Sequence, residues 1–143
     1  WESLKAQERS AKGASSAMDG VAIALPALMR AEKLQKRAAR VGFDWPGPGG
    51  AADKLHEEMI ELEQASEADK VEEAGDLLFA AANLARLYGI APEDALRAAN
   101  AKFERRFRSM EMLAEHAGED FAALSLDEQE AWWQAVKHAE KMG

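Results

Sequence analysis

The hydrophobic positions of the chain follow a helical period over several stretches. Between residues 26 and 41 they recur at alternating intervals of four and three, which predicts a helix that buries one stripe. This stripe consists of Ala27, Ala31, Leu34, Ala38 and Val41. Residues 51–65 carry a similar stripe at Leu55, Met59 and Leu62. These two stretches are expected to form the first two helices of the core.

Breaks between the helices are marked by proline, glycine and capping residues. The stretch DWPGPGG (44–50) holds two prolines and three glycines, so it is expected to interrupt the chain before the second helix. Ser66 and Asp69 have the spacing of a capping box, with Asp in place of the usual Glu or Gln. A third helix is predicted from this point to Tyr88.

The C-terminal part of the chain is also predicted to be helical. A long fourth helix is expected from Pro92 to about Ala117, and Ser125 with Glu128 forms a second predicted capping box ahead of a short last helix. No stretch of four to eight residues alternates in the way of a strand bounded by turns. The predicted fold class is therefore all-α, a bundle of about four core helices plus a short C-terminal helix.

Composition and charge reduce the number of possible functions. A chain of 143 residues suits one domain, here residues 21–143 after a polar lead-in or linker over residues 1–20. The formal charge of −8 argues against non-specific nucleic-acid binding, and no apolar run is long enough to cross a membrane. The absence of cysteine excludes disulfides, thiolate nucleophiles and Cys-based zinc sites, and it fits a cytoplasmic location. The start at Trp1, without Met, is expected for a piece of a longer protein.

Two acidic triplets share the pattern acid-acid-x-x-acid on the second and third predicted helices. They are Glu57, Glu58 and Glu61 in HEEMIE, and Glu72, Glu73 and Asp76 in VEEAGD. Positions i, i+1 and i+4 fall within an arc of about 100° on a helix, so each triplet forms a tight cluster of carboxylates.

The acidic triplets border apolar surface. Glu58 is next to the stripe of the second helix, and the run LLFAAANLA after Asp76 is apolar on every side except at Asn83. Two carboxylates about 5 Å apart repel by about 3 kcal/mol at an effective dielectric near 20, so partly buried acids need protons or a cation. Solvated helix faces on an acidic protein are the alternative. The repeated triplet favours a site for a hard divalent cation such as Mg²⁺.

Basic residues provide candidate phosphate contacts. On the fourth helix Lys102 and Arg106 share a face, and the planar guanidinium of Arg suits phosphate oxygens. A salt-bridged surface face is the alternative. The first helix carries a basic face with Arg30, Lys33 and Arg37, which either attracts nucleotide or is simply solvated.

The acidic pattern, taken with several other segments, resembles the MazG family of all-α nucleoside triphosphate pyrophosphohydrolases. The resemblance is carried by Glu57-Glu58-x-x-Glu61 followed by Glu73-x-x-Asp76. It extends over PALMRAEKLQKRAARVGFDW (26–45), GDLLFAAANLAR (75–86), ANAKFERRFR (99–108) and WWQAVK (132–137). The chain looks most like the C-terminal of the two tandem domains of full-length bacterial MazG.

The resemblance implies Mg²⁺-dependent hydrolysis of nucleoside triphosphates to monophosphate and pyrophosphate by a homodimer of helical bundles, with Mn²⁺ as a substitute ion. The implied metal ligands are Glu58, Glu61, Glu73 and Asp76, with Glu57 and Glu72 as supporting acids. Either Glu58 or Glu61 is expected to activate the attacking water. The implied nucleotide contacts are Lys102 and Arg106 for the triphosphate, Trp133 for the base or ribose, and Asn83 as a hydrogen-bonding partner.

Other functions remain open at this point. One is a non-catalytic helical module for dimerisation or regulation in a longer protein. Another is a related all-α hydrolase specific for one nucleotide such as dUTP. The segment KFERRF favours the general MazG function.

In the MazG hypothesis, the apolar run after Asp76 is explained by contact with a second protomer.

Overall fold

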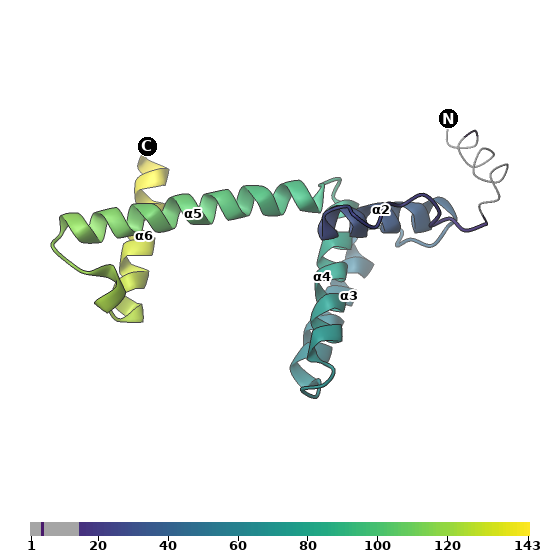
Figure 1. Ribbon diagram of the computed structural model, residues 1–143, viewed down its shortest axis with the longest axis horizontal. Coiled ribbons are helices and arrows are strands. Elements are labelled where there is room, and N and C mark those ends of the chain that lie inside the picture. The colour runs from purple at the N-terminus through teal and green to yellow at the C-terminus, as the bar shows by residue number, and fades with distance from the viewer. Residues whose placement is uncertain (1–3, 5–14) are drawn as a thin grey trace. The chain divides into compact units, whose positions relative to one another are not determined.

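The computed structural model describes residue 4 and residues 15–143, so most of the predicted lead-in (1–20) lies outside the described residues. All secondary-structure elements among these residues are helices, and no strand occurs among them (Figure 1). This confirms the all-α prediction. In chain order they are α2 (Ala27–Arg40), α3 (Pro48–Gln64), α4 (Lys70–Leu87), α5 (Pro92–His116), the 3₁₀ turn η1 (Phe121–Ala123) and α6 (Leu126–Met142).

The chain forms two compact units, residues 1–95 and residues 96–143. In the first unit α3 and α4 run antiparallel, side by side, and α2 packs against α4 (Figure 1). The second unit contains most of α5, together with η1 and α6. The two acidic triplets therefore lie on the paired helices α3 and α4 of the first unit.

The predicted break at DWPGPGG is shorter than expected, because α3 starts at Pro48 and not at residue 51. Proline is well suited to the first helical position, where its missing N–H has no partner to lose. Gly50 lies in the first turn beneath the ring of Trp45, and a Cβ at Gly50 would come within 2.6 Å of Trp45 Cε3. The absence of a side chain at Gly50 therefore lets an aromatic ring pack closely on the backbone of the first turn.

The two predicted capping boxes have different outcomes. The Ser125–Glu128 box is confirmed, with Glu128 N donating to Ser125 Oγ at 3.2 Å and Ser125 N donating to Glu128 Oε1 at 3.1 Å. The box at Ser66 is wrong, because Ser66 Oγ donates to Asp69 Oδ2 and no side chain caps α4. The helix after Ser125 is also longer than predicted, at 17 residues.

The buried face of α3 differs from the predicted stripe by one position. Its buried residues are Ala51 and Glu58, whereas Met59 is 52 % exposed. The inward positions are thus Ala51, Leu55, Glu58 and Leu62, at intervals of four, three and four. The carboxylate of Glu58 is therefore buried at the position in the core that the hydrophobic pattern had assigned to Met59.

Helix α2 also buries a polar side chain. Gln35 is 6 % exposed and its Nε2 donates to the backbone oxygen of Phe79 in α4 at 2.9 Å. Ala27 and Val41, at the ends of the predicted stripe, are exposed. The side-chain amide therefore ties α2 to the middle of α4, where the hydrophobic stripe alone had been expected to do so.

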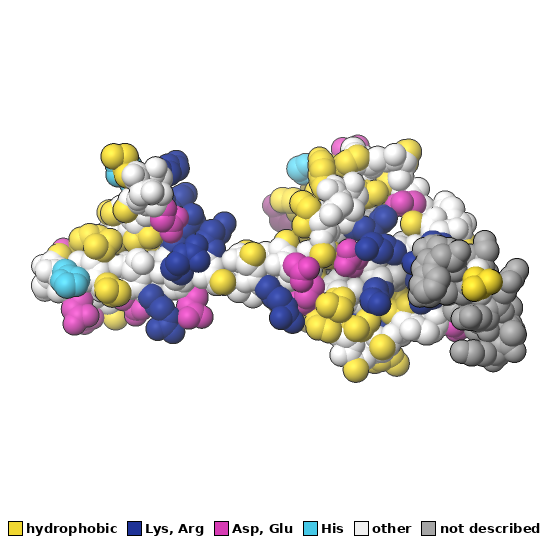
Figure 2. Space-filling view, turned by 90° about the horizontal axis from the view of Figure 1, so that it is seen from above, with side chains coloured by type: hydrophobic (Ala, Val, Ile, Leu, Met, Phe, Trp, Pro, Cys, Tyr) yellow, Lys and Arg dark blue, Asp and Glu magenta, His cyan; other side chains and the backbone are white. Residues whose placement is uncertain are grey.

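Both units carry exposed apolar side chains, which Figure 2 shows as yellow surface. In the first unit these include Ile60 (53 % exposed), Leu78 (61 %) and Phe79 (47 %). The run after Asp76 is therefore only partly buried within its own unit. None of the helices in the described part of the chain is long and apolar enough to cross a membrane.

Candidate metal centre

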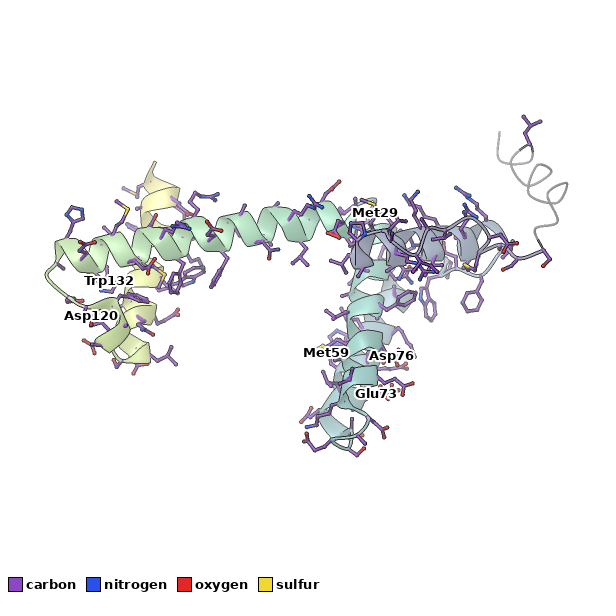
Figure 3. All side chains as sticks on the ribbon, in the orientation of Figure 1. Met29, Met59, Glu73, Asp76, Asp120 and Trp132 are labelled. Atoms are coloured by element: carbon purple, nitrogen blue, oxygen red, sulfur yellow. The ribbon has the colours of Figure 1, made fainter. Side chains whose placement is uncertain are left out.

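Three carboxylates converge between α3 and α4. Glu58 comes from α3, and Glu73 and Asp76 come from one face of α4 because they are three residues apart. One ligand atom from each of the three lies within 4.8 Å of the others. Figure 3 shows Glu73 and Asp76 projecting on the same side of the helix pair, with Met59 on the opposite side. The antiparallel pairing thus brings acids of the two sequence triplets into one cluster.

The cluster contains oxygen atoms without hydrogen-bond partners. Glu58 is 5 % exposed, and its Oε2 is buried without a partner, as is Oε2 of Glu73. Leaving a buried acceptor unsatisfied costs about 1–3 kcal/mol, and more when the group is charged. A hard divalent cation takes carboxylate oxygens as ligands and would compensate this cost. The residues present therefore fit a metal ion.

Burial and mutual repulsion raise the pKa of Glu73 above the ordinary glutamate value. Desolvation is the largest cause, followed by the negative charges of Glu61, Asp76 and Glu58. A side-chain hydrogen bond to Glu61 also favours the protonated form. Without a cation, Glu73 therefore ionises less readily than an ordinary glutamate, as expected for a carboxyl close to other carboxylates.

The other predicted acids are more exposed than Glu58 and Glu73. Glu61 is exposed, one turn after Glu58 on α3, and is close enough to Glu73 to form that hydrogen bond. Glu57 and Glu72 are exposed. The structure thus places three predicted ligands together and the fourth beside them, and it leaves the two supporting acids exposed.

Lys54 is a member of the site that the sequence analysis missed. Its Nζ lies 3.0 Å from Glu58 Oε1 and 3.6 Å from Glu57 Oε2. The hydrogen bond to Glu58 is the main cause that raises the pKa of Lys54. The spacing of four residues between Lys54 and Glu58 is a recognisable helix signal that could have indicated this contact.

We expect Glu73→Gln to stabilise the metal-free protein at pH 8 and to lose this advantage at pH 4. A carboxyl with a raised pKa stabilises the fold only when protonated, so the wild type regains stability as pH falls through the pKa of Glu73. The measurement is the difference in urea midpoint between variant and wild type, in EDTA. Glu72→Gln is the control, since Glu72 is exposed on the same helix. An equal difference at both pH values would contradict the expectation.

Asn83 belongs to a separate polar network in the first unit. Its Oδ1 accepts a hydrogen bond from Arg86 Nε at 2.9 Å, and Arg86 forms an ion pair with Asp44. That guanidinium lowers the pKa of Asp44 through its hydrogen bond. The network links α4 to the turn before α3, so Asn83 Oδ1 takes part in holding these two segments together.

Arg37, on the predicted basic face of α2, is also engaged within the protein. Its Nη1 donates to the backbone oxygens of Ala17 at 3.1 Å and Asp19 at 2.7 Å. This side chain therefore holds the segment that precedes α2.

The predicted nucleotide contacts Lys102, Arg106 and Trp133 lie in the second unit. Arg106 binds Glu140 on α6 through two nitrogens, with Nη2 to Oε2 at 2.8 Å, and this bond lowers the pKa of Glu140. The guanidinium also lies 5.4 Å from the centre of the Trp133 ring, whereas Lys102 is exposed. Arg106 thus already holds a carboxylate in the forked geometry that suits a phosphate.

Trp133 lines an apolar pocket of the second unit. The pocket has a volume of about 340 Å³, and Phe103, Phe107 and Phe121 also line it. The ring of Phe103 lies 5.9 Å from that of Trp133. The tryptophan is therefore part of a small aromatic cluster with an open face.

Comparison with known proteins identifies relatives over nearly the whole chain. It is 48 % identical over 146 residues to "Nucleoside triphosphate pyrophosphohydrolase" of Escherichia coli, which covers 98 % of this chain and 56 % of that protein. It is 41 % identical over 138 residues to "Nucleoside triphosphate pyrophosphohydrolase/pyrophosphatase MazG" of Thermotoga maritima, covering 96 % of this chain and 54 % of that protein. A third relative is "Uncharacterized protein YabN" of Bacillus subtilis, 42 % identical over 99 % of this chain and 30 % of its own length.

These similarities confirm the resemblance to MazG-type proteins that the acidic pattern indicated. The chain spans about half the length of the curated relatives that are named as pyrophosphohydrolases. No family model matches the chain.

Proposed function

We propose that this chain, a relative of MazG-type proteins along nearly all its length, is a divalent-metal-dependent nucleoside triphosphate pyrophosphohydrolase. The products would be a nucleoside monophosphate and pyrophosphate. The observation that carries the proposal is the convergence of Glu58, Glu73 and Asp76, with buried oxygens that lack a partner. The names of the relatives support the substrate class.

Glu58, Glu61, Glu73 and Asp76 are the proposed metal ligands, and Mg²⁺ is the proposed ion, with Mn²⁺ as a substitute. When bound, such an ion neutralises phosphate charge and orients the phosphate oxygens. Three of these residues already present oxygens within 4.8 Å of one another. Glu57 and Glu72, which are exposed, would support them by holding waters.

Glu61 is the better of the two candidates for orienting or deprotonating the attacking water. Glu58 is buried and its Oε1 is bound by Lys54, which suits a ligand more than a base. Glu61 is exposed beside Glu73, so water and substrate can reach it. A general base must lie within hydrogen-bond reach of the proton that it removes.

Lys102 and Arg106 are the proposed contacts for the triphosphate, supplied by the same or a second copy of the chain. They would stabilise the charge that develops on phosphate oxygens in the transition state. Trp133 offers an aromatic face for the base or ribose. Asn83 would contribute through its Nδ2 donor, because its Oδ1 is held by Arg86.

A homodimer is the proposed assembly, and the exposed apolar residues of the first unit support it. Leu78 and Phe79 on α4 are 61 % and 47 % exposed although they follow the metal cluster directly. Burying such side chains against a second copy contributes about 25 cal/mol per Å². Sedimentation equilibrium should give twice the mass of the chain, and a monomer at tens of micromolar would contradict this assembly.

The direct test is a screen of ribo- and deoxyribonucleoside triphosphates for pyrophosphate release. We expect turnover of several of them with Mg²⁺, loss of turnover in EDTA, and recovery when Mg²⁺ is added back. Turnover of a single substrate such as dUTP would favour a specialised hydrolase. No turnover of any nucleotide, by a folded protein loaded with Mg²⁺, would favour a non-catalytic helical module.

A further inference from the structure

We propose that Lys54 is a resident counter-ion of the acidic cluster and competes with the divalent cation for it. The inference rests on the metal site of the proposed function and adds a residue that sets the affinity of that site. We assign this role to Lys54 because its ammonium contacts the cluster. It lies four residues before the buried Glu58 on the same helix.

The contacts of Lys54 place a positive charge directly on the cluster. Its Nζ lies 3.0 Å from Glu58 Oε1, while Glu58 Oε2 is buried and has no partner. The same ammonium lies 3.6 Å from Glu57 Oε2. One oxygen of the buried carboxylate is thus neutralised by the protein itself, and the other oxygen is left for a ligand.

A divalent ion on Glu58 would lie close to this ammonium. Metal–oxygen distances for Mg²⁺ are about 2.1 Å, so an ion on the free Oε2, across the carboxylate from the oxygen that Lys54 contacts, would lie within about 7 Å of Nζ in the observed conformation. Even with the dielectric constant of water, repulsion at that distance weakens binding by about tenfold. The Lys54 side chain is 44 % exposed, so the effect should also diminish with salt.

An alternative role for Lys54 would have the opposite effect on metal affinity. If its main effect were to hold Glu58 in a ligating conformation, removing it would weaken metal binding. Glu58 is 5 % exposed, however, so packing between α3 and α4 already restricts its side chain. The competing charge is therefore the larger effect.

The test is calorimetric titration of the full chain with Mn²⁺ alone, comparing the wild type with Lys54→Met and Lys54→Arg. We expect Lys54→Met to bind Mn²⁺ about tenfold more tightly at low salt, with the gain reduced in 0.5 M KCl. Lys54→Arg keeps the charge and should stay within about threefold of the wild type. The metal-free Lys54→Met protein should also melt at a lower temperature, because the cluster loses its counter-ion.

Lys36→Met is the matched control. Lys36 pairs with Glu32 on α2 at 3.3 Å, also four residues apart, and its partner is likewise mostly buried. This variant should leave Mn²⁺ affinity unchanged. If the wild type binds Mn²⁺ tightly and Lys54→Met binds it equally or more weakly, the inference about Lys54 is overturned but the proposed metal site is not. Absence of Mn²⁺ binding by the wild type would instead overturn the proposed metal site.

Discussion

Replacement of Asp76 by asparagine is expected to lower kcat/KM for nucleoside triphosphates by about a thousandfold, equivalent to about 4 kcal/mol of transition-state stabilisation. Asn has the same shape but no charge, so the metal loses an anionic ligand while the packing of α4 is kept. The metal-free variant should be at least as stable as the wild type, because the repulsion among the converging carboxylates falls. Steady-state kinetics and urea unfolding of the same preparation measure both effects.

Glu67→Gln is the matched control for the Asp76 variant. Glu67 precedes α4, its side chain is 93 % exposed, and it pairs with Lys70 outside the cluster. Its removal should leave kcat/KM within about twofold, as is usual for a surface charge. If Asp76→Asn keeps a tenth or more of the wild-type kcat/KM, Asp76 does not hold a catalytic metal ion.

Arg106→Ala is expected to raise KM for nucleoside triphosphates by about thirtyfold, because hydrogen bonds to charged groups contribute about 1.5–3 kcal/mol. Its stability should fall by only about 1 kcal/mol, since the ion pair with Glu140 is partly exposed and the contact with Trp133 is a single cation–π interaction. KM, kcat and the unfolding midpoint should be measured together.

Two further variants separate phosphate binding from structure. Arg108 lies on the same helix and pairs with Glu104 at 2.9 Å, but it is 72 % exposed, so Arg108→Ala should leave KM unchanged. Glu140→Gln removes the partner of Arg106 and frees its guanidinium, so KM should fall or stay constant. If Glu140→Gln raised KM as much as Arg106→Ala, the arginine would serve only to hold α5 against α6.

Helix boundaries were predictable where local chemistry determines them. The Ser125–Glu128 box forms as its sequence indicates, because both hydrogen bonds join residues three apart. The start of α3 was misplaced, and the structure shows the ring of Trp45 packed on Gly50 in the first turn of this helix. That packing involves a side chain outside the helix, and the hydrophobic pattern does not contain it.

The candidate site shows the same distinction between local and tertiary information. The two acidic triplets were visible in the sequence, and the pairing of α3 with α4 brings members of both together. The burial of Glu58 in place of Met59 was not predicted, because residue type suggested the opposite assignment. A core position occupied by a carboxylate is itself a sign of a functional constraint.

Partners far apart in sequence could not be predicted. The pair Arg106–Glu140 joins residues 34 apart, and Arg86–Asp44 joins residues 42 apart, so neither has a periodic signal. From the sequence, Arg106 was expected either to bind phosphate or to lie on a salt-bridged face with no partner named, and Arg86 was left unassigned. Lys54 is different, since its spacing to Glu58 was available in the sequence and was overlooked.

Diffraction from crystals soaked in Mn²⁺, collected at the manganese absorption edge, tests the central claim most directly. The account predicts one strong anomalous peak between α3 and α4, with carboxylate oxygens of Glu58, Glu73 and Asp76 at about 2.2 Å from it and Glu61 beside it. No peak at this position at millimolar Mn²⁺, with Glu58 still bound only to Lys54, would contradict it.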